Sequence, residues 1–290
     1  MTQHLVQQLP SPWLHYAIAL QTARKNVRPV AATTSWRTAP LRPDAQRLAR
    51  YLALCGLAVR PTLPPLWPQI LAGPLHLAMV TGKDWPAPAL GMVHLRNTIE
   101  QLQPIAADAA LEVVAAPGPL VDGPAGLEVA IDTEVWANGT LVWRSQLVAL
   151  HRVKGKRGKP TPGRAFVPPD RSPDRLIEFS APEDIGRAYG RVAGDINPIH
   201  INALAAKAFG FPKAIAHGTW TAARALAAVS DLLPDPGPQA VHHTIVFVRP
   251  VFLPAKLTLV AWQQGSQVWW QVQSGPNGKT VHVRGEASYG

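Results

Sequence analysis

The stretch YGRVAGDINPIHINALAAKAFGFPKAIAHGTW, residues 189–220, gathers polar side chains in a chain that has few acids. Asp195, Asn197 and His200 fall within six residues. Asn197 followed by Pro198 predicts a helix start, because Asn can cap a helix and Pro fits its first position. The helix is expected over PIHINALAAKAF, with His200 in its first turn and Asp195 in the preceding loop. A carboxylate and an imidazole aimed at one small volume could hold a water molecule and move a proton.

A purely structural role is the alternative for these residues: Asp195 and Asn197 as alternative caps, and His200 as a surface residue. Further along, the segment AIAHGTW predicts a second helix that starts at Gly218, after a short apolar strand. The N–H groups of residues 218–220 would then point outward at the positive end of the helix dipole. Such donors could stabilise an oxyanion on a carbonyl. The alternative is that His217 is only a turn residue and Gly218 only a close-packing point.

The composition is that of a folded globule. The chain has 290 residues, of which 47% are hydrophobic and 16% charged, and its length makes two units the natural expectation. The longest apolar runs, such as YLALCGLAV (51–59), are too short to span a membrane, and the N-terminus lacks a secretion pattern. A single cysteine, Cys55, excludes an internal disulfide and is expected in the core. We therefore expect a cytoplasmic protein with no membrane partner.

The net charge of +10 could indicate nucleic acid, an acidic surface or a phosphorylated ligand as partner. The densest basic segment is HRVKGKRGKPTPGR (151–164), which is rich in Gly and Pro and has no interleaved aromatic residues. This composition is typical of an exposed linker rather than of a surface on which bases stack. No nucleic-acid partner is therefore expected.

The basic segment also separates two parts of the chain that match in the same order. WPQILAGPLHLAM (67–79) resembles FPKAIAHGTWTAA (211–223), MVHLRNTIE (92–100) resembles TIVFVRPVF (244–252), and LEVVAA (111–116) resembles LTLVAW (257–262). Asn-Gly at 138–139 and at 277–278 predicts one hairpin in each part. The pattern predicts a duplicated α+β unit, in which a helix packs on antiparallel strands.

The second unit is expected to contain a short strand, then helices, and then a run of strands. Helices are expected at 182–193 and at 219–233, the second ended by Pro234, and strands at 175–180, 240–250, 256–264, 267–274 and 279–289.

Three segments, GDINPIH, AIAHG and IVFVRPVFLPAKL, together resemble the MaoC-like family of (R)-specific enoyl-CoA hydratases, also called hydratase 2, which have the hot-dog fold. The resemblance covers about residues 174–290. With the internal repeat it implies a double hot-dog that forms a pseudo-dimer. Residues 1–150 would be a degenerate hot-dog that accommodates the acyl chain, residues 151–168 a basic linker, and residues 169–290 the catalytic hot-dog.

The resemblance also implies an activity and its residues. Asp195 and His200 would hold a water and add it across the double bond next to a thioester carbonyl, or catalyse the reverse dehydration. Asn197 would orient the bound groups. The backbone N–H of Gly218 would polarise the thioester oxygen.

Four further residues are implied as substrate contacts. They are Thr219 beside the Gly218 donor, His217 before it, and Arg249 and Lys256 where the phosphates of the carrier would leave the tunnel. The substrate would be an acyl-CoA or acyl-carrier-protein thioester. Neither a cofactor nor a metal is expected, and a homodimer is left open.

The first half departs from the family pattern. CGLAVRPTLPPLWP (55–68) stands in place of the signature, and Gly73-Pro74 is expected in place of His217-Gly218. Because Pro74 has no N–H, this half could not supply the donor, and we expect one catalytic centre per chain. The alternatives are an acyl-CoA thioesterase with the same fold, a non-catalytic acyl-thioester-binding protein, and a nucleic-acid-binding protein that uses only the positive charge.

Overall fold

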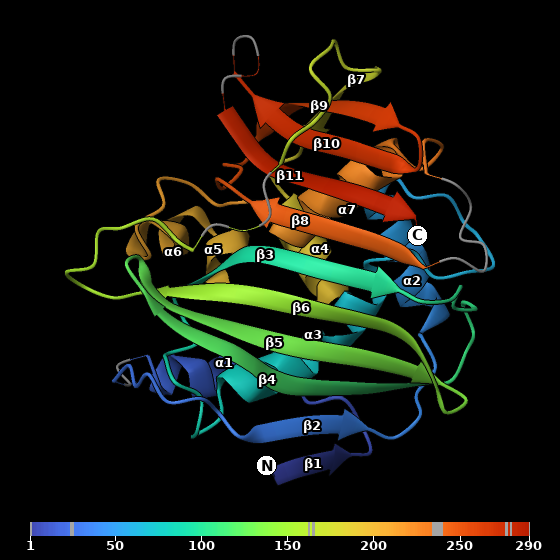
Figure 1. Ribbon diagram of the computed structural model, residues 1–290. Coiled ribbons are helices and arrows are strands. Elements are labelled where there is room, and N and C mark those ends of the chain that lie inside the picture. The colour runs from blue at the N-terminus through green and yellow to red at the C-terminus, as the bar shows by residue number, and fades with distance from the viewer. Residues whose placement is uncertain are drawn as a thin grey trace.

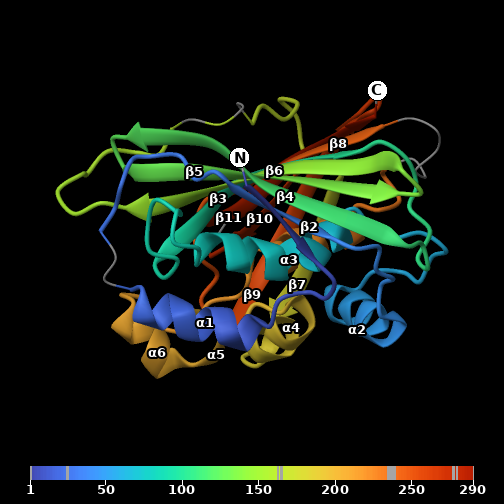
Figure 2. The same cartoon turned by 90° about the horizontal axis from the view of Figure 1, so that it is seen from below.

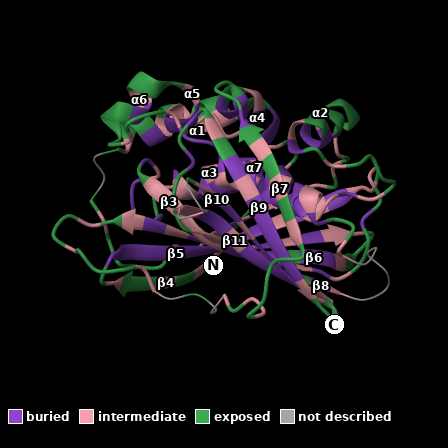
Figure 3. Ribbon diagram, turned by 90° about the horizontal axis from the view of Figure 1, so that it is seen from above, coloured by how far each residue is buried: buried purple, intermediate pink, exposed green. Residues whose placement is uncertain are grey.

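The computed structural model describes residues 2–23, 26–161, 163, 166–233, 240–275, 278 and 280–289. Its backbone is one sheet of 11 strands in the order β1-β2-β4-β5-β6-β3-β8-β11-β10-β9-β7, with the helices gathered on one face (Figures 1 and 2). The buried residues lie between the sheet and the helices, and α6 lies at the exposed rim (Figure 3). The expected α+β class is confirmed.

Residues 34–152 of the first half contribute five neighbouring antiparallel strands and two helices. The Asn-Gly hairpin joins β5 to β6, and Asn138 and Gly139 have φ values of 50° and 76°, as this turn requires. The elements are β2 (Thr34–Thr38), α2 (Ala45–Cys55), α3 (Trp67–Val80), β3 (Met92–Gln101), β4 (Leu111–Gly123), β5 (Gly126–Ala137) and β6 (Thr140–Arg152).

The second half repeats this arrangement in reverse spatial order, so that β7, β9, β10, β11 and β8 match β2, β4, β5, β6 and β3. Strands β10 and β11 pair as expected, although Asn277 of their turn lies outside the described residues. The elements are β7 (Arg175–Ala181), α4 (Ile185–Ala193), α5 (Pro198–Ile201), α6 (Ala203–Ala208), α7 (Gly218–Ala228), β8 (Val241–Phe247), β9 (Ala255–Gln264), β10 (Gln267–Ser274) and β11 (Thr280–Tyr289).

The two halves join where β3 pairs with β8, with Asn97 opposite Ile245. Because this pairing is antiparallel, the two five-stranded units form one continuous sheet with an approximate twofold relation between them. Each half has a central helix, α3 or α7, with a fully buried tryptophan in its first turns, Trp67 or Trp220. The duplicated unit expected from the sequence is therefore present in the structure.

Two elements at the N-terminus were not expected from the sequence. Strand β1 (Thr2–Val6) pairs in parallel with β2, and helix α1 (Pro12–Gln21) packs against α3 of the same half. Sequence patterns missed α1 because its apolar residues do not form a clear stripe. In the part of the chain that the structure describes, every helix is too short or too polar to cross a membrane.

The single helix expected over PIHINALAAKAF is wrong, because the chain forms two short helices there, α5 and α6. Asn202 has an extended backbone between them (φ −142°, ψ 131°). Its side-chain oxygen accepts hydrogen bonds from the N–H groups of Leu204 and Ala205 and so caps α6. Helix α7 is also shorter than expected and ends at Ala228, and Pro234 lies outside the described residues.

The expected match of Gly73-Pro74 with His217-Gly218 is also wrong. Gly73 and Pro74 lie inside α3, whereas Gly218 begins α7. The backbone fixes the true register, because Leu63 N donates to Ile105 O (2.8 Å) just as Ala216 N donates to Val251 O (2.9 Å). Counting on from Leu63 and Ala216 matches Pro64-Pro65 with His217-Gly218, and Trp67 with Trp220. The aromatic-Pro pairs that suggested the earlier match are not equivalent.

Arginines fasten each half to a helix end of the other. Arg47 of α2 donates to the carbonyl oxygens of Val192 (2.6 Å) and Ala193 (3.4 Å) at the end of α4. In return, Arg224 of α7 donates to the carbonyl oxygen of Cys55 (3.1 Å) at the end of α2. Cations at helix C-termini satisfy the last carbonyls and oppose the helix dipole. Cys55 itself is buried, as expected.

Candidate active site

Three residues expected to be functional come together at one end of α7. A carboxylate oxygen of Asp195, a ring nitrogen of His200 and a ring nitrogen of His217 all lie within 4.8 Å of one another. Asp195 follows α4, His200 lies in α5, and His217 immediately precedes α7. The Asp195 side chain is 44% exposed to solvent, so a small molecule can reach it, whereas the two histidine rings are buried.

Small residues let the Asp195 loop lie directly on α4. Gly194 ends this helix in the left-handed region (φ 75°) and turns the chain toward Asp195. A Cβ atom at Gly186 would lie 1.9 Å from the carbonyl oxygen of His200, and one at Gly190 would lie 2.6 Å from that of Asp195. Neither position therefore has room for a side chain while the loop keeps its place.

The predicted helix start at Asn197 is confirmed. The Asn197 side chain accepts a hydrogen bond from Ile199 N (3.4 Å), and Pro198 occupies the first helical position. The backbone N–H of Asn197 also donates to Asp195 Oδ1 (3.2 Å). This residue thus fixes both the helix that carries His200 and the carboxylate in front of it.

Backbone carbonyls set the tautomers of both histidines. His200 Nδ1 lies 2.9 Å from Ile215 O and must carry the proton, because a carbonyl oxygen only accepts. Nε2 of a neutral His200 is then a free base. His217 Nε2 likewise donates to Asp195 O (3.0 Å), and it lies 3.7 Å from Asp195 Oδ2. The two rings stack with centroids 3.7 Å apart.

The surroundings keep His217 neutral and Asp195 ionised. Burial, together with the neighbouring His200, lowers the pKa of His217 to about 3. Burial raises the pKa of the Asp195 carboxyl. The His217 and His200 rings and the hydrogen bonds from Tyr16 and Asn197 lower this pKa by more than burial raises it. The net pKa of Asp195 is below its ordinary value, so the site presents a carboxylate at neutral pH.

Tyr16, which the sequence did not indicate, completes the site from α1. Its hydroxyl donates to Asp195 Oδ1 at 2.5 Å, across 179 positions of sequence. Burial and the Asp195 charge raise the pKa of Tyr16 well above its usual range, so the hydroxyl keeps its proton and remains a donor. Helix α1 is held in turn by a contact of His15 Nδ1 with Thr81 Oγ1 (2.8 Å) at the end of α3. No local pattern could have revealed this partner.

His94, a histidine of the first half, lies close enough to the site for the Asp195 charge to affect its pKa. His94 of β3 packs its ring 4.4 Å from that of Phe247. Burial lowers the pKa of His94 to about 4, and the Asp195 charge acts on it in the opposite direction. The sequence placed His94 within a segment of the repeat but did not indicate a role near Asp195.

The N-terminus of α7 provides backbone donors next to the histidines. The first N–H groups of an α-helix have no partner within the helix, and here they belong to Gly218, Thr219 and Trp220. Gly218 allows the helix start to pack on Phe247, since a Cβ atom there would lie 2.6 Å from that ring. The expected helix start at Gly218 is confirmed.

Arg249 and Lys256 lie elsewhere. Arg249 is exposed in the loop that follows β8, where its backbone N–H donates to His282 O (3.1 Å), rather than on the strand itself. Lys256 is exposed within β9, opposite Ser180. Within the described ranges, neither side chain makes a hydrogen bond or ion pair with Asp195, His200 or His217.

One oxygen and two imidazole nitrogens within 4.8 Å are a donor set that a divalent metal could also use. However, the His217 nitrogen that lies 3.7 Å from Asp195 Oδ2 is Nε2, which already donates to Asp195 O. His200 Nδ1 is likewise paired with a carbonyl.

Comparison with known proteins places the chain in a family. Residues 164–284 match the MaoC like domain. 3-Hydroxyacyl-thioester dehydratase X of Mycobacterium tuberculosis is 37% identical over 213 residues, which is 73% of this chain and 74% of that protein. The crystal structure of HtdX of M. tuberculosis superposes with a TM-score of 0.74 at 30% identity, covering 87% of this chain and 98% of that one.

A more distant M. tuberculosis protein, described as having a double hot-dog fold, matches with a TM-score of 0.55 at 13% identity over 90% of this chain and 97% of that one. This likeness concerns the fold alone, and with the HtdX superposition it confirms the expected double hot-dog. The chain belongs to the MaoC-like family of hydratases and dehydratases.

Proposed function

We propose that the protein catalyses the reversible hydration of trans-2-enoyl thioesters to (R)-3-hydroxyacyl thioesters, or the reverse dehydration. The observation that carries the proposal is the convergence of the Asp195 carboxylate and the basic Nε2 of His200 at the N-terminus of α7. A carboxylate, a base and backbone donors are the groups that this chemistry requires. The name of the M. tuberculosis relative, a 3-hydroxyacyl-thioester dehydratase, agrees with this reaction.

In the hydration direction, Asp195 and His200 hold one water between them. One of them takes a proton from this water as its oxygen bonds to C3 of the enoyl group, and the pair then delivers a proton to C2, so that one water is added in total. The backbone N–H of Gly218, assisted by Thr219, donates to the thioester oxygen, which gains negative charge as the new bond forms. His217 remains neutral because its pKa is about 3, and it supports the Asp195 backbone through Nε2.

Tyr16 and Asn197 act as positioning residues in this proposal. Both donate to Asp195 Oδ1, which leaves the second carboxylate oxygen available to the water. Because Tyr16 belongs to α1, the first half takes part in a site whose other members belong to the second half.

The finer assignments of the proposal concern domains, substrate and place of action. We propose that residues 1–150 are a degenerate hot-dog that accommodates the acyl chain, residues 151–168 a basic linker, and residues 169–290 the catalytic hot-dog. The substrate would carry coenzyme A or an acyl-carrier protein, with Arg249 and Lys256 near its phosphates. The reaction would take place in the cytoplasm without a metal or cofactor.

The test is to incubate the purified chain with trans-2-enoyl-CoA esters of increasing length. The proposal predicts loss of the enoyl absorbance and formation of 3-hydroxyacyl-CoA, with no release of free thiol. Free thiol without a 3-hydroxy product would instead assign a thioesterase. Binding of the thioester with neither product would assign a non-catalytic binding protein, and both outcomes would contradict the proposal.

A further inference from the structure

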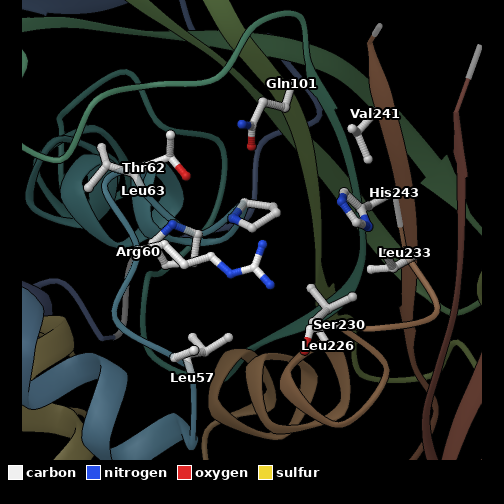
Figure 4. A pocket seen from close by; sticks show the side chains of 13 residues that line it. Leu57, Arg60, Thr62, Leu63, Gln101, Leu226, Ser230, Leu233, Val241 and His243 are labelled. Atoms are coloured by element: carbon white, nitrogen blue, oxygen red, sulfur yellow. The ribbon is translucent and has the colours of Figure 1, made fainter. Parts of the chain in front are cut away.

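The first half has a pocket at the place where the second half has its site. The pocket has a volume of about 100 Å³ and lies among the 57–65 loop, the end of α7 and the paired strands β3 and β8 (Figure 4). The 57–65 loop precedes α3 as the Asp195 loop precedes α7. The isolated bridges Thr62–Ala106 and Ile215–Phe252 occur at equivalent points of the two halves.

A shortened loop leaves this space open. Residues 57–62 separate Gly56 from Leu63, whereas residues 195–215, which include α5 and α6, separate Gly194 from Ala216. Gly56 and Gly194 both end a helix in the left-handed region, so the two loops start from the same geometry. The first half therefore has no counterpart of Asp195 or His200. Pro64 and Pro65 also remove the N–H groups that His217 and Gly218 supply.

Most residues that line the pocket are apolar, among them Leu57, Leu63, Leu226, Leu233 and Val241. Arg60, Thr62 and Ser230 also line it, together with two buried polar side chains. Gln101 and His243 face the same space from β3 and β8, and each residue is only 2% exposed (Figure 4).

Three polar atoms of these two side chains lack hydrogen-bond partners. Gln101 Oε1 and both ring nitrogens of His243 have no partner among the described residues. A buried polar group without a partner is destabilising and is rare in folded proteins. The unpaired atoms therefore indicate that the pocket takes a molecule that can pair with them.

The unpaired atoms define the chemistry of that molecule. Burial lowers the pKa of His243 to about 4, so the neutral ring offers one N–H donor and one lone pair. Gln101 Oε1 offers an acceptor. A hydroxyl group can donate to Gln101 Oε1 and accept from the His243 N–H, and so can pair with both residues at once. Arg60 also lines the pocket, with its guanidinium group among the labelled side chains (Figure 4). A dry cavity of about 150 Å³ can hold benzene, so a single ring would fill this pocket of about 100 Å³ and extend toward its rim at Ser230.

We propose that this pocket is a second, non-catalytic binding site for a small apolar molecule with one hydroxyl group, such as an alcohol or a phenol. Leu226 follows Gly218 by eight residues along α7, which corresponds to about 12 Å at the helical rise per residue. The pocket thus lies toward the opposite end of this helix from the proposed catalytic centre, and its occupation does not depend on the proposed reaction.

The test compares 4-fluorophenol with 4-fluorotoluene, which has nearly the same shape but no hydroxyl, by fluorine NMR titration of the full chain. The proposal predicts saturable binding of 4-fluorophenol at least about tenfold tighter than that of 4-fluorotoluene. His243→Leu should abolish this preference. Ser230→Trp, at the exposed rim, should abolish binding of both probes, while Ser172→Trp, on an exposed surface elsewhere, should leave binding unchanged.

Three results would overturn the inference. One is the absence of saturable binding, and another is equal affinity for the two probes. The third concerns turnover: if 4-fluorophenol competes with the enoyl thioester, or if Ser230→Trp raises the KM for it, the pocket belongs to the substrate path and is not a separate site. Binding is read directly in the NMR titration, so a failure of the proposed hydratase reaction would leave this test intact.

Discussion

The loops that precede the two central helices occupy equivalent places, but only one of them carries the residues of the candidate site. Residues 195–218 carry a carboxylate, two imidazoles and a glycine helix start, whereas the loop of residues 57–66 is shorter and contains Pro64 and Pro65. The strands and helices around both loops match one another. The comparison shows that the fold supplies a frame at two places, and that the length and composition of one loop decide where chemistry can occur.

The halves are nevertheless not independent. Tyr16 of the first half donates to Asp195 of the second, and Arg47 and Arg224 cap helices across the junction. The first half thus supports the candidate site and the junction through these contacts. The following changes compare residues of the two halves.

The largest difference is expected between histidines. Asp195→Asn or His200→Gln should each lower turnover by about a hundredfold or more, because each removes a group that holds or deprotonates the water. His76→Gln, at a buried first-half histidine that contacts Thr133 Oγ1 (2.8 Å), should change turnover by less than about threefold. Steady-state rates and circular dichroism of all three variants check this. Near-normal turnover in either second-half variant would remove the proposed mechanism.

A smaller difference is expected between glycines of the central helices. Gly218→Ala would place a Cβ atom 2.6 Å from the Phe247 ring, so the helix start must shift, and we expect kcat/KM to fall about tenfold. Gly73→Ala in α3 meets its nearest neighbour, Ala193 O, at an ordinary 3.6 Å and should leave kcat/KM unchanged. Equal effects of the two substitutions would show that the start of α7 has no special function.

Tyr16→Phe tests the link between the halves. Removing this hydrogen bond takes away one of the interactions that lower the pKa of Asp195, so the pKa should rise. Because the reaction needs the carboxylate, activity lost on acidification should then be lost at a higher pH than in the parent protein. We expect kcat/KM at neutral pH to fall only about two- to fivefold. The measurement is a pH profile of kcat/KM, with Trp13→Phe on the exposed face of α1 as control. An acid limb that does not shift would show that Tyr16 does not lower the pKa of a carboxylate needed for activity.

The smallest effect concerns stability. Trp220 Nε1 donates to Leu54 O (3.0 Å), whereas Nε1 of the equivalent Trp67 has no partner among the described residues. Both Trp220→Phe and Trp67→Phe replace a buried indole by a phenyl ring, but only Trp220→Phe also removes a hydrogen bond. Trp220→Phe should therefore lower the free energy of unfolding by about 1 kcal/mol more than Trp67→Phe. Urea denaturation curves of both variants measure the difference. An equal or reversed order would mean that this contact between the halves adds no stability.

The sequence was most informative where a structure depends on neighbouring residues. The Asn197-Pro198 helix start, the Gly218 helix start and the Asn138-Gly139 hairpin each follow from local backbone preferences, and all three are present. The spacing of Asp195 and His200 also fixes their proximity, because Asp195 lies in the short loop between α4 and α5 and His200 lies within α5.

Other features depend on contacts that no local pattern encodes. Tyr16 meets Asp195 only through folding, and α1 has no clear apolar stripe to predict it. Asn202 broke an expected helix because its side chain can cap a new one as readily as it can continue the old one. The register of the repeat was misread because two aromatic-Pro pairs resemble each other by chance, and only the hydrogen bonds of Leu63 and Ala216 reveal the true equivalence.

The central claim is that the chain has one hydratase centre, built on Asp195 and His200 and completed by the first half. It is tested most directly by chiral analysis of the product formed from a trans-2-enoyl-CoA ester by the full chain and by Asp195→Asn. We predict that the parent protein forms only the (R)-3-hydroxyacyl thioester and that Asp195→Asn forms almost none. An (S) or mixed product, or an undiminished yield of the (R) product from Asp195→Asn, would contradict the account.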